Sequence, residues 1–287
     1  MQPVDDGYFP RGESVLRRVH GAKAVGVVYG QRALLMQATH PLAFAGLIAN
    51  TQGLEAPFRR LAHTAKTMEQ VFFGTRAEAD AVTARVRAMH ARVEGELEAP
   101  AGPHPAGAPY RADSAEFLLW ILACLADSAL EAYERLVREL SPAERERFWR
   151  DYALLGELFG LDRAEAPAGY AGFRAYMDER LASADLHVVE QAHELGRRVA
   201  FELPLPANRA PALRVINFLV VGLLPARVRE LYDIEWDGSR QVAFDALCRS
   251  LRVSAWLTPA ALRRGPSAAD YDVVARTERE RLRRAAA

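Results

Sequence analysis

Residues 60–90 read RLAHTAKTMEQVFFGTRAEADAVTARVRAMH, and the first of them carry three polar side chains at helical spacing. Arg60, His63 and Thr64 lie three and four residues apart, so a helix presents them on one face. A guanidinium, an imidazole and a hydroxyl then stand together as hydrogen-bonding groups. This face is the first candidate site of the chain.

Two consecutive helices are predicted around this face. The first covers about Pro57–Phe73 and stops at Gly74. Thr75-Arg-Ala-Glu78 is a capping-box signature for the second helix, which we expect to end near Glu98. His90 lies on the apolar stripe of this second helix, whose other members are Val82, Val86, Met89, Val93 and Leu97. A lone imidazole in an apolar stripe is the second candidate site.

The imidazole of His90 has two interpretations. It is an ordinary core histidine if both of its ring nitrogens find protein partners. It is a metal ligand if one nitrogen is left for iron while the other bonds to a carbonyl or a carboxylate. One axial nitrogen, an apolar wall and a few donors on the far side are the elements of a haem pocket. We therefore interpret His90 as a candidate haem-iron ligand.

Arg60 also has two interpretations. It can be solvated together with Arg59 on an exposed helix face, or it can point inward. Phe58, Leu61 and Met68 on the same helix favour the inward position. An inward arginine needs an anion, because an unpaired charge in a low-dielectric site is costly. A haem propionate or an activated oxygen species meets that need.

The other histidines carry weaker signals. His40 directly precedes Pro41 at a predicted helix start, where its ring either caps the helix or donates a hydrogen bond beside a cofactor. His104 lies in a loop rich in proline and glycine, residues 100–109, which is the best candidate for a mobile segment or lid. We expect His104, and His20 among its arginine neighbours, to be exposed to solvent.

Helical periodicity dominates the remaining sequence, and period-two alternation is nearly absent. Pro225 should break or kink the helical segment over residues 211–232. We see no internal repeat and no low-complexity linker. The sequence therefore predicts an all-α fold, with residues 1–287 in a single helical domain.

Composition limits the partners of the chain. Its 37 basic and 37 acidic residues give a formal charge of zero, which offers no electrostatic reason to bind nucleic acid. The longest apolar run, residues 215–225, is shorter than the roughly 20 residues that span a bilayer. The first residues are acidic and lack the apolar core of a signal peptide. We expect a cytoplasmic protein with no stable membrane anchor.

Other site chemistries have less support. Cys124 and Cys248 lie in apolar helical patterns and are expected to be buried free thiols. Glu190 and His193 form half of a di-iron carboxylate motif, but the sequence holds no second Glu-x-x-His pair. The phosphate-binding loop, the serine-hydrolase elbow, the dinucleotide-binding fingerprint and the zinc-protease motif are all missing from the sequence.

Taken in order, the motifs of residues 37–95 resemble one family. They are Gln-x-x-His-Pro ending at Pro41, Arg-x-x-x-Thr ending at Thr64, Phe-Gly ending at Gly74, and Met-His-x-x-Val-x-Gly ending at Gly95. This order is similar to that of the MpaB-type oxygenases, whose catalytic domain is shared with latex-clearing protein, the rubber oxygenase. Each motif is common, whereas their combination is specific.

The resemblance implies a globin-like helical core around haem b. His90 matches the proximal axial histidine, and Arg60 and Thr64 match the distal residues that support catalysis. His63 falls where the rubber oxygenase carries a lysine able to cap the iron. These matches assign Arg60, His63 and Thr64 to catalysis, and they assign His90, with Arg60 and His40, to the cofactor.

The chain also departs from the family. The rubber oxygenase uses an acidic residue upstream of the arginine helix as a proposed base, but residues 31–54 contain no Asp or Glu. That role is empty or is taken by Glu13, Glu55 or His63. Rubber-active members are exported and fungal members are membrane-anchored, whereas we expect neither for this chain. Cleavage of polyisoprene is therefore not assigned to it from the resemblance.

The expected function is that of a haem b-dependent oxygenase that uses dioxygen on an apolar substrate, such as an isoprenoid or lipid-like alkene. Two alternatives stay open. The chain can be a haem-binding sensor or peroxidase-like protein without oxygenase turnover. It can also be a haem-free helical interaction protein. The sequence does not specify the oligomeric state.

Overall fold

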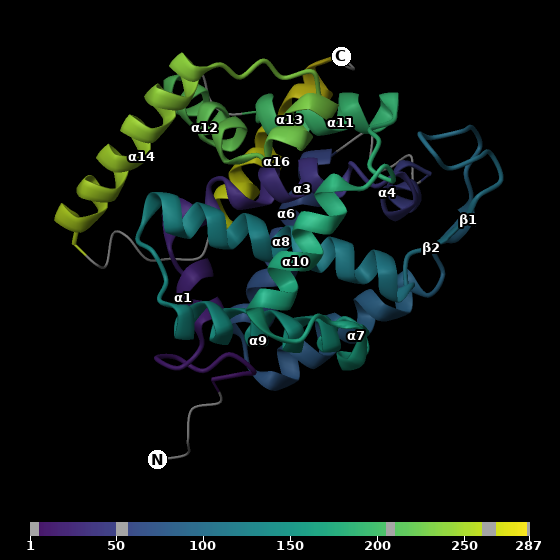
Figure 1. Ribbon diagram of the computed structural model, residues 1–287, viewed down its shortest axis with the longest axis horizontal. Coiled ribbons are helices and arrows are strands. Elements are labelled where there is room, and N and C mark those ends of the chain that lie inside the picture. Colours follow the sequence, from purple (N-terminus) through teal and green to yellow (C-terminus); the bar gives the residue numbers. More distant parts are fainter. Residues whose placement is uncertain (1–5, 50–56, 205–209, 260–267, 286–287) are drawn as a thin grey trace.

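Helices make up nearly all of the regular structure, as the sequence predicts. The computed structural model describes residues 6–49, 57–204, 210–259 and 268–285 (Figure 1). Its α-helices are α1 Val15–His20, α2 Lys23–Gly26, α3 Tyr29–Gln37, α4 Pro41–Ile48, α6 Pro57–Phe73, α7 Arg76–His90, α8 Ala115–Leu136, α9 Pro142–Leu158, α10 Gly169–Ala182, α11 Glu190–Phe201, α12 Ala210–Leu223, α13 Ala226–Leu231, α14 Gly238–Leu257 and α16 Ala268–Ala285. A 3-10 turn covers Arg163–Glu165. The all-α prediction is confirmed.

Helix α8 crosses the middle of the molecule (Figure 1). Ser114 caps its start by accepting a hydrogen bond from the Phe117 amide, and apolar side chains follow on every side of the helix. A helix with buried apolar side chains along its whole length lies in the core, and α8 packs against α2, α3, α4, α9, α12 and α14. Trp120 in this helix is completely buried. The main hydrophobic core is built around α8.

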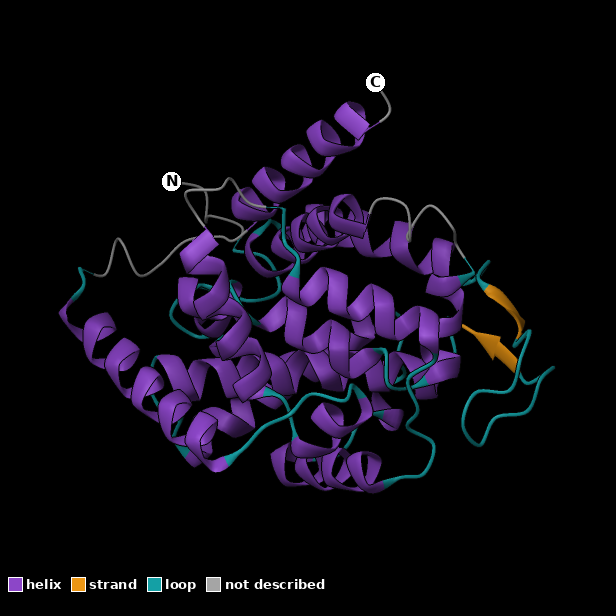
Figure 2. Cartoon of the chain, turned by 90° about the horizontal axis from the view of Figure 1, so that it is seen from above, coloured by secondary structure: helices purple, strands orange, loops and turns teal. Residues whose placement is uncertain are grey.

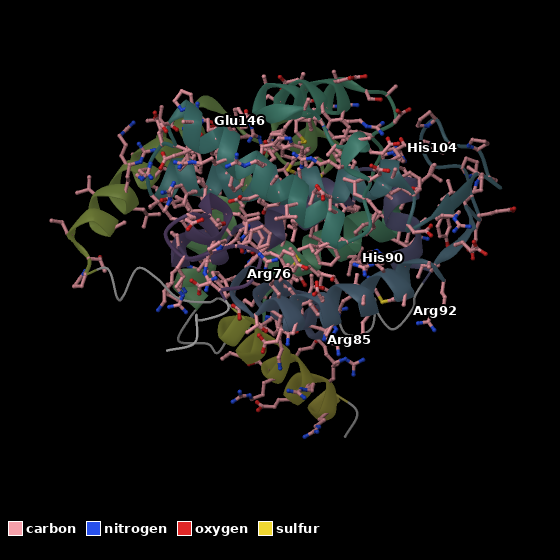
Figure 3. The ribbon with its side chains drawn as sticks, turned by 90° about the horizontal axis from the view of Figure 1, so that it is seen from below. Arg76, Arg85, His90, Arg92, His104 and Glu146 are labelled. Atoms are coloured by element: carbon pink, nitrogen blue, oxygen red, sulfur yellow. The ribbon has the colours of Figure 1, made fainter. Side chains whose placement is uncertain are left out.

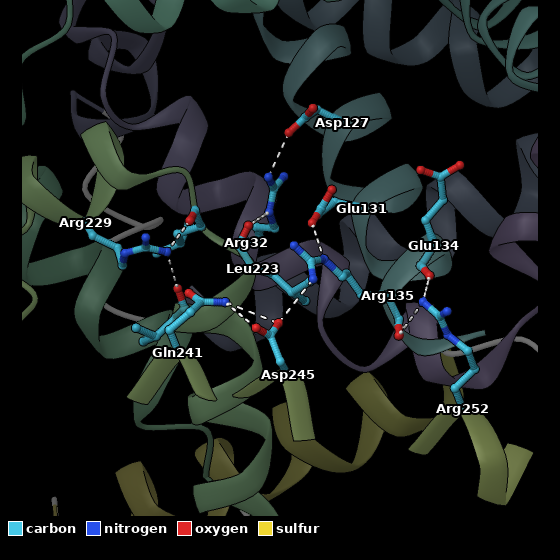
Figure 4. A network of polar contacts seen from close by, with 12 residues as sticks. Arg32, Asp127, Glu131, Glu134, Arg135, Leu223, Arg229, Gln241, Asp245 and Arg252 are labelled. Atoms are coloured by element: carbon cyan, nitrogen blue, oxygen red, sulfur yellow. Dashed lines mark hydrogen bonds and ion pairs between the residues drawn. The ribbon is translucent and has the colours of Figure 1, made fainter. Parts of the chain in front are cut away.

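A buried ion pair joins α3 to this central helix. Arg32 donates to Asp127 Oδ2 over 2.7 Å and to Ser128 Oγ over 2.7 Å, both on α8 (Figure 4). Its Nε donates to the Leu223 carbonyl at the end of α12 over 2.7 Å. Arg174 of α10 pairs with the other oxygen of Asp127 at 2.5 Å. Two guanidiniums and one carboxylate thus join four helices, α3, α8, α10 and α12.

Helices α6 and α7 form an antiparallel pair. The predicted capping box is present: Thr75 accepts from the Glu78 amide, and the Glu78 side chain accepts from the Thr75 amide. Only the turn at Gly74 separates the two helices, so the start of α6 lies beside the end of α7. Pro225 interrupts the helix at the predicted place, between α12 and α13.

The region after His90 differs from the prediction. Helix α7 ends at His90, and the chain turns into a short strand, β1 Glu94–Glu96, that pairs antiparallel with β2 Pro109–Arg111. This hairpin extends from one end of the helical body (Figure 2). Met89 is 45% exposed, and Val93 and Leu97 lie beyond the helix. The predicted apolar stripe thus ends at His90. Met89 points to solvent, and Val93 and Leu97 belong to the segment that forms the hairpin.

The network around Asp127 gives a first prediction. Asp127→Asn should lower the free energy of unfolding by about 3–5 kcal/mol, since it leaves the Arg32 charge buried without its partner. Asp178→Asn is the matched control, because Asp178 pairs with the same Arg174 but its side chain is 71% exposed. The control should stay within about 0.5 kcal/mol of the wild type. Urea unfolding measures both, and equal losses would contradict this account.

Candidate functional site

The predicted polar face of α6 is accessible to solvent. Phe58, Ala62 and other apolar side chains of α6 are buried against the core, whereas Arg60, His63 and Thr64 are exposed. Desolvation nevertheless lowers the pKa of the Arg60 guanidinium. Protein atoms therefore lie close to a side chain that water still reaches. Arg60 is thus exposed at the surface of α6, and the inward orientation that the sequence favours stays a prediction.

His90 is the last residue of α7 and is half-buried. Figure 3 shows His90 on the side of α7 that faces the helical body, whereas Arg85 and Arg92 extend away from it. Its Nδ1 is buried and has no hydrogen-bond partner in the described structure. An ordinary core histidine satisfies both nitrogens, so this ring does not meet that description. The described part of the structure also shows no carbonyl or carboxylate bonded to the other ring nitrogen, so the ring meets only the first of the two conditions for a metal ligand.

Arg60 and His90 are brought together by the antiparallel α6–α7 pair. Burial lowers the pKa of His90, and the positive charge of Arg60 lowers it further. The carboxylate of Asp113, just before α8, acts in the opposite direction. Asp113 also accepts hydrogen bonds from Arg111. Sequence reasoning missed Asp113, because nothing in the spacing of residues 90 and 113 shows that the hairpin brings them together.

An apolar cluster borders this region. It is formed by residues from the end of α3, from α4 and from α11, and Leu61 of α6 packs against it. Leu61 directly follows Arg60, so the polar face and the apolar cluster meet on α6. The buried members of the cluster are Ala38, Phe44, Ala192, Leu195 and Val199. The structure thus places an apolar cluster next to the turn of α6 that carries Arg60, and its role as the wall of a haem pocket stays a prediction.

His40 lies in a different environment. It is the N-cap of α4, where its Nδ1 accepts from the Ala43 amide over 3.4 Å. Its ring stacks on His104, and its Nε2 lies 3.8 Å from Glu116 Oε1. Burial, assisted by the charge of Arg180, lowers the pKa of His40 to about 4. The capping alternative is confirmed, while contact with a cofactor stays a prediction.

The expected exposure of His20 and His104 is wrong. His20 is buried between α1 and its neighbours, stacks on Phe72, and places Nε2 2.6 Å from the Tyr152 hydroxyl. Burial lowers the pKa of His20 to about 3. His104 is half-buried over His40, and its Nε2 is buried without a partner in the described structure. Both contacts join residues far apart in the sequence, so local pattern gives no sign of them.

The structure also shows the surroundings of the two cysteines and of His193, which the sequence offered as weaker candidates for a site. Cys124 and Cys248 are buried free thiols, as predicted. His193 stacks on Tyr232, and its Nε2 lies 3.3 Å from the Tyr232 carbonyl oxygen. Within the described residues, no group of three or more His, Cys, Asp or Glu side chains is arranged to hold a metal ion. Glu55, one of the candidate bases, lies outside the described residues.

The fold and the site define an all-α protein with one unpaired imidazole nitrogen beside an arginine and an apolar wall. Residues 17–253 match the family described as ER-bound oxygenase mpaB/B'/Rubber oxygenase, catalytic domain. The match covers most of the chain, including α6, α7 and the hairpin. The chain belongs to this family of oxygenases, as its motifs predict.

Two mycobacterial proteins are also similar. Uncharacterized protein Rv2237 of Mycobacterium tuberculosis and Uncharacterized protein Mb2261 of Mycobacterium bovis are each 24% identical over 203 residues, which cover 71% of this chain and 76% of the relative. No solved structure matches the chain. No helix in the described part of the chain combines the length and the apolar character that crossing a bilayer requires.

The burial of His40 predicts acid sensitivity. The pKa of His40 falls from 6.5 to about 4 on folding, so between these pH values the unfolded chain binds a proton that the folded chain does not. Its contribution to stability is complete above pH 6.5 and is lost as pH falls towards 4, at up to about 1.4 kcal/mol per pH unit.

His40→Asn is the variant that tests this. Asparagine keeps a helix-capping oxygen but does not titrate. The free energy of unfolding of His40→Asn, measured in urea from pH 7 to pH 4, should therefore depend on pH less steeply than that of the wild type, by about one proton. A slope identical to that of the wild type would show that His40 is not held neutral by the fold.

Proposed function

We propose that this chain is a haem b-dependent oxygenase that acts with dioxygen on an apolar, alkene-containing substrate of the isoprenoid or lipid type. The observation that carries the proposal is the unpaired, buried Nδ1 of His90 beside Arg60, in a chain that belongs to an oxygenase family. The family to which the chain belongs is a family of oxygenases. The haem and the substrate class are our inference.

The residues fit a haem in three respects. Histidine is one of the side chains that hold haem iron, and the ring nitrogen that binds the iron must be unprotonated. His90 supplies a ring whose pKa is lowered by burial and whose Nδ1 has no partner in the described structure. Arg60 supplies a cation that a propionate can neutralise. The cluster around Phe44 and Leu195 supplies an apolar wall.

Bound haem would supply the activation of dioxygen, which the side chains of the protein cannot perform. Arg60, His63 and Thr64 would provide hydrogen-bond donors on the exposed face of α6. Donors fixed on a helix stabilise negative charge that develops on oxygen atoms, and they need little rearrangement to do so. His63 can also hold or transfer a proton at its ring nitrogens.

The border of the apolar cluster, where Leu47, Ile48 and Leu61 are only partly buried, would orient the substrate, because the inner members are already covered by protein. Its side chains have no hydrogen-bonding groups, so they favour a hydrocarbon over a polar ligand. A hydrocarbon that covers them also excludes water from the region of Arg60, which strengthens the electrostatic action of the guanidinium. The substrate class is therefore an apolar chain with a reactive double bond.

The iron ligand is tested by the visible spectrum of protein produced with a haem precursor. Wild-type protein should show a Soret band, and His90→Ala should lose the band or shift it strongly, because the axial nitrogen is removed. Met89→Ala is the matched control, since Met89 is the neighbouring residue but is 45% exposed. Its spectrum should equal that of the wild type.

The other outcomes of this experiment favour the alternatives. Free-haem absorption that stays unchanged after reconstitution would favour a haem-free helical interaction protein. A Soret band together with firm ligation by His63 in both oxidation states, and no oxygen binding, would favour a sensor. A band that is equal in wild type and His90→Ala would show that another residue holds the iron.

The donor role of Arg60 is tested with azide, an anion that binds ferric haem. Arg60→Ala should weaken azide binding by about 10- to 100-fold, as expected for the loss of a hydrogen bond from a charged group. Arg59→Ala is the matched control, because Arg59 is exposed on the adjacent position of the same helix. Equal azide affinity in Arg60→Ala and Arg59→Ala would exclude Arg60 from the ligand side of the haem.

A further inference from the structure

The start of α6 is held by a residue from the other end of the chain. Glu278 lies on α16, beyond the residues 17–253 that match the oxygenase family. Its side chain is buried, with an exposed fraction of 3%. A carboxylate is rarely buried unless it is paired, so the partners of Glu278 indicate what it does.

The partners of Glu278 are the first backbone amides of α6. Its Oε1 accepts from the Phe58 amide over 3.4 Å, and its Oε2 accepts from the Arg59 amide over 3.0 Å. Amides in the first turn of a helix have no carbonyl partner within the helix. A negative charge at this end is also favoured by the helix dipole. Glu278 thus performs for α6 the task of an N-cap, supplied from α16.

Apolar packing accompanies this cap. Helix α16 packs on α6 more extensively than any other pair of elements in the described structure. Val274, one turn before Glu278, is buried against Phe58 and Leu203, and Leu61 packs on the same cluster. Phe58 and Leu61 flank Arg60 in the sequence. The contacts of α16 therefore hold the turn of α6 from which Arg60 extends.

The junction is not close-packed throughout. A cavity of about 220 Å³ lies between α6, α11 and α16, and it is lined by Phe58, Arg198, Glu202, Pro204, Glu278 and Leu282. Because side chains do not fill this space, packing alone fixes the first turn of α6 less tightly than a filled core would. The two hydrogen bonds to Glu278 gain importance for that reason.

We propose that Glu278 is a positioning residue, which fixes the first turn of α6 and thereby the placement of the Arg60 guanidinium at the oxygenase site. The effect on Arg60 rests on the proposed function, whereas the cap on α6 does not. In this arrangement the C-terminal helix completes a site whose other parts lie within the family-matched region.

Amide hydrogen exchange in the full chain tests the cap directly. In Glu278→Gln the charge and one acceptor oxygen are lost at nearly unchanged volume, so the Phe58 and Arg59 amides should exchange about five- to tenfold faster. Glu278→Ala should show a larger increase. Glu280→Gln is the matched control, because Glu280 is exposed on the same helix. Exchange at the wild-type rate in both Glu278 variants would overturn the proposal.

A double-mutant cycle tests the action through Arg60. Glu278→Gln should weaken azide binding to the ferric, haem-loaded protein about threefold to tenfold, but it should have no further effect in the Arg60→Ala background. A general loss of structure would lower azide affinity equally in both backgrounds, and that result would overturn positioning. Failure of the wild type to bind haem would overturn both the proposed function and the action on Arg60, while amide exchange would still decide the cap.

Discussion

The buried pair of Arg32 and Asp127 is the constraint on which the rest of the architecture depends. Neither charge can be left alone in the core, so the contacts of Arg32 with Asp127 and Leu223 fix α3, α8 and the end of α12 relative to one another (Figure 4). Arg174 adds α10 through the same carboxylate. Gln37, at the end of α3, accepts from the Trp120 indole and donates to the Ile121 carbonyl, both on α8. These contacts fix the end of α3, from which the chain continues into α4. The apolar cluster, which contains residues of α4 and contacts Leu61, can therefore form next to Arg60.

The sequence predicted those parts of the fold that local chemistry controls. The capping box at Thr75, the stop at Gly74 and the break at Pro225 were all correct, because each depends on residues within one turn of it. The strand at residues 94–96 was missed, since three residues are too few to show an alternation. The burial of His20 and His104 was missed because their partners come from distant segments. Tertiary contact overrode local pattern in both cases.

In the candidate site, too, the sequence predicted the features that depend on neighbouring residues and missed those that depend on distant segments. The spacing of Arg60, His63 and Thr64 predicted that they share one face of a helix, and all three are exposed on α6. Asp113 and Glu278 could not be predicted, because Asp113 reaches His90 through the hairpin and Glu278 reaches α6 from a helix more than 200 residues later. The buried Nδ1 of His90 has no hydrogen-bond partner in the described structure, a property that it shares with His104 Nε2 and that the sequence does not reveal.

The central claim is that His90 binds haem iron, and resonance Raman spectroscopy of the ferrous, haem-loaded protein tests it most directly. The account predicts an iron–imidazole stretching band in the wild type that disappears in His90→Ala and returns when free imidazole is added, since the small ligand can occupy the space that the side chain leaves. A band that persists unchanged in His90→Ala would contradict the claim, because the iron would then be held by another histidine of the chain.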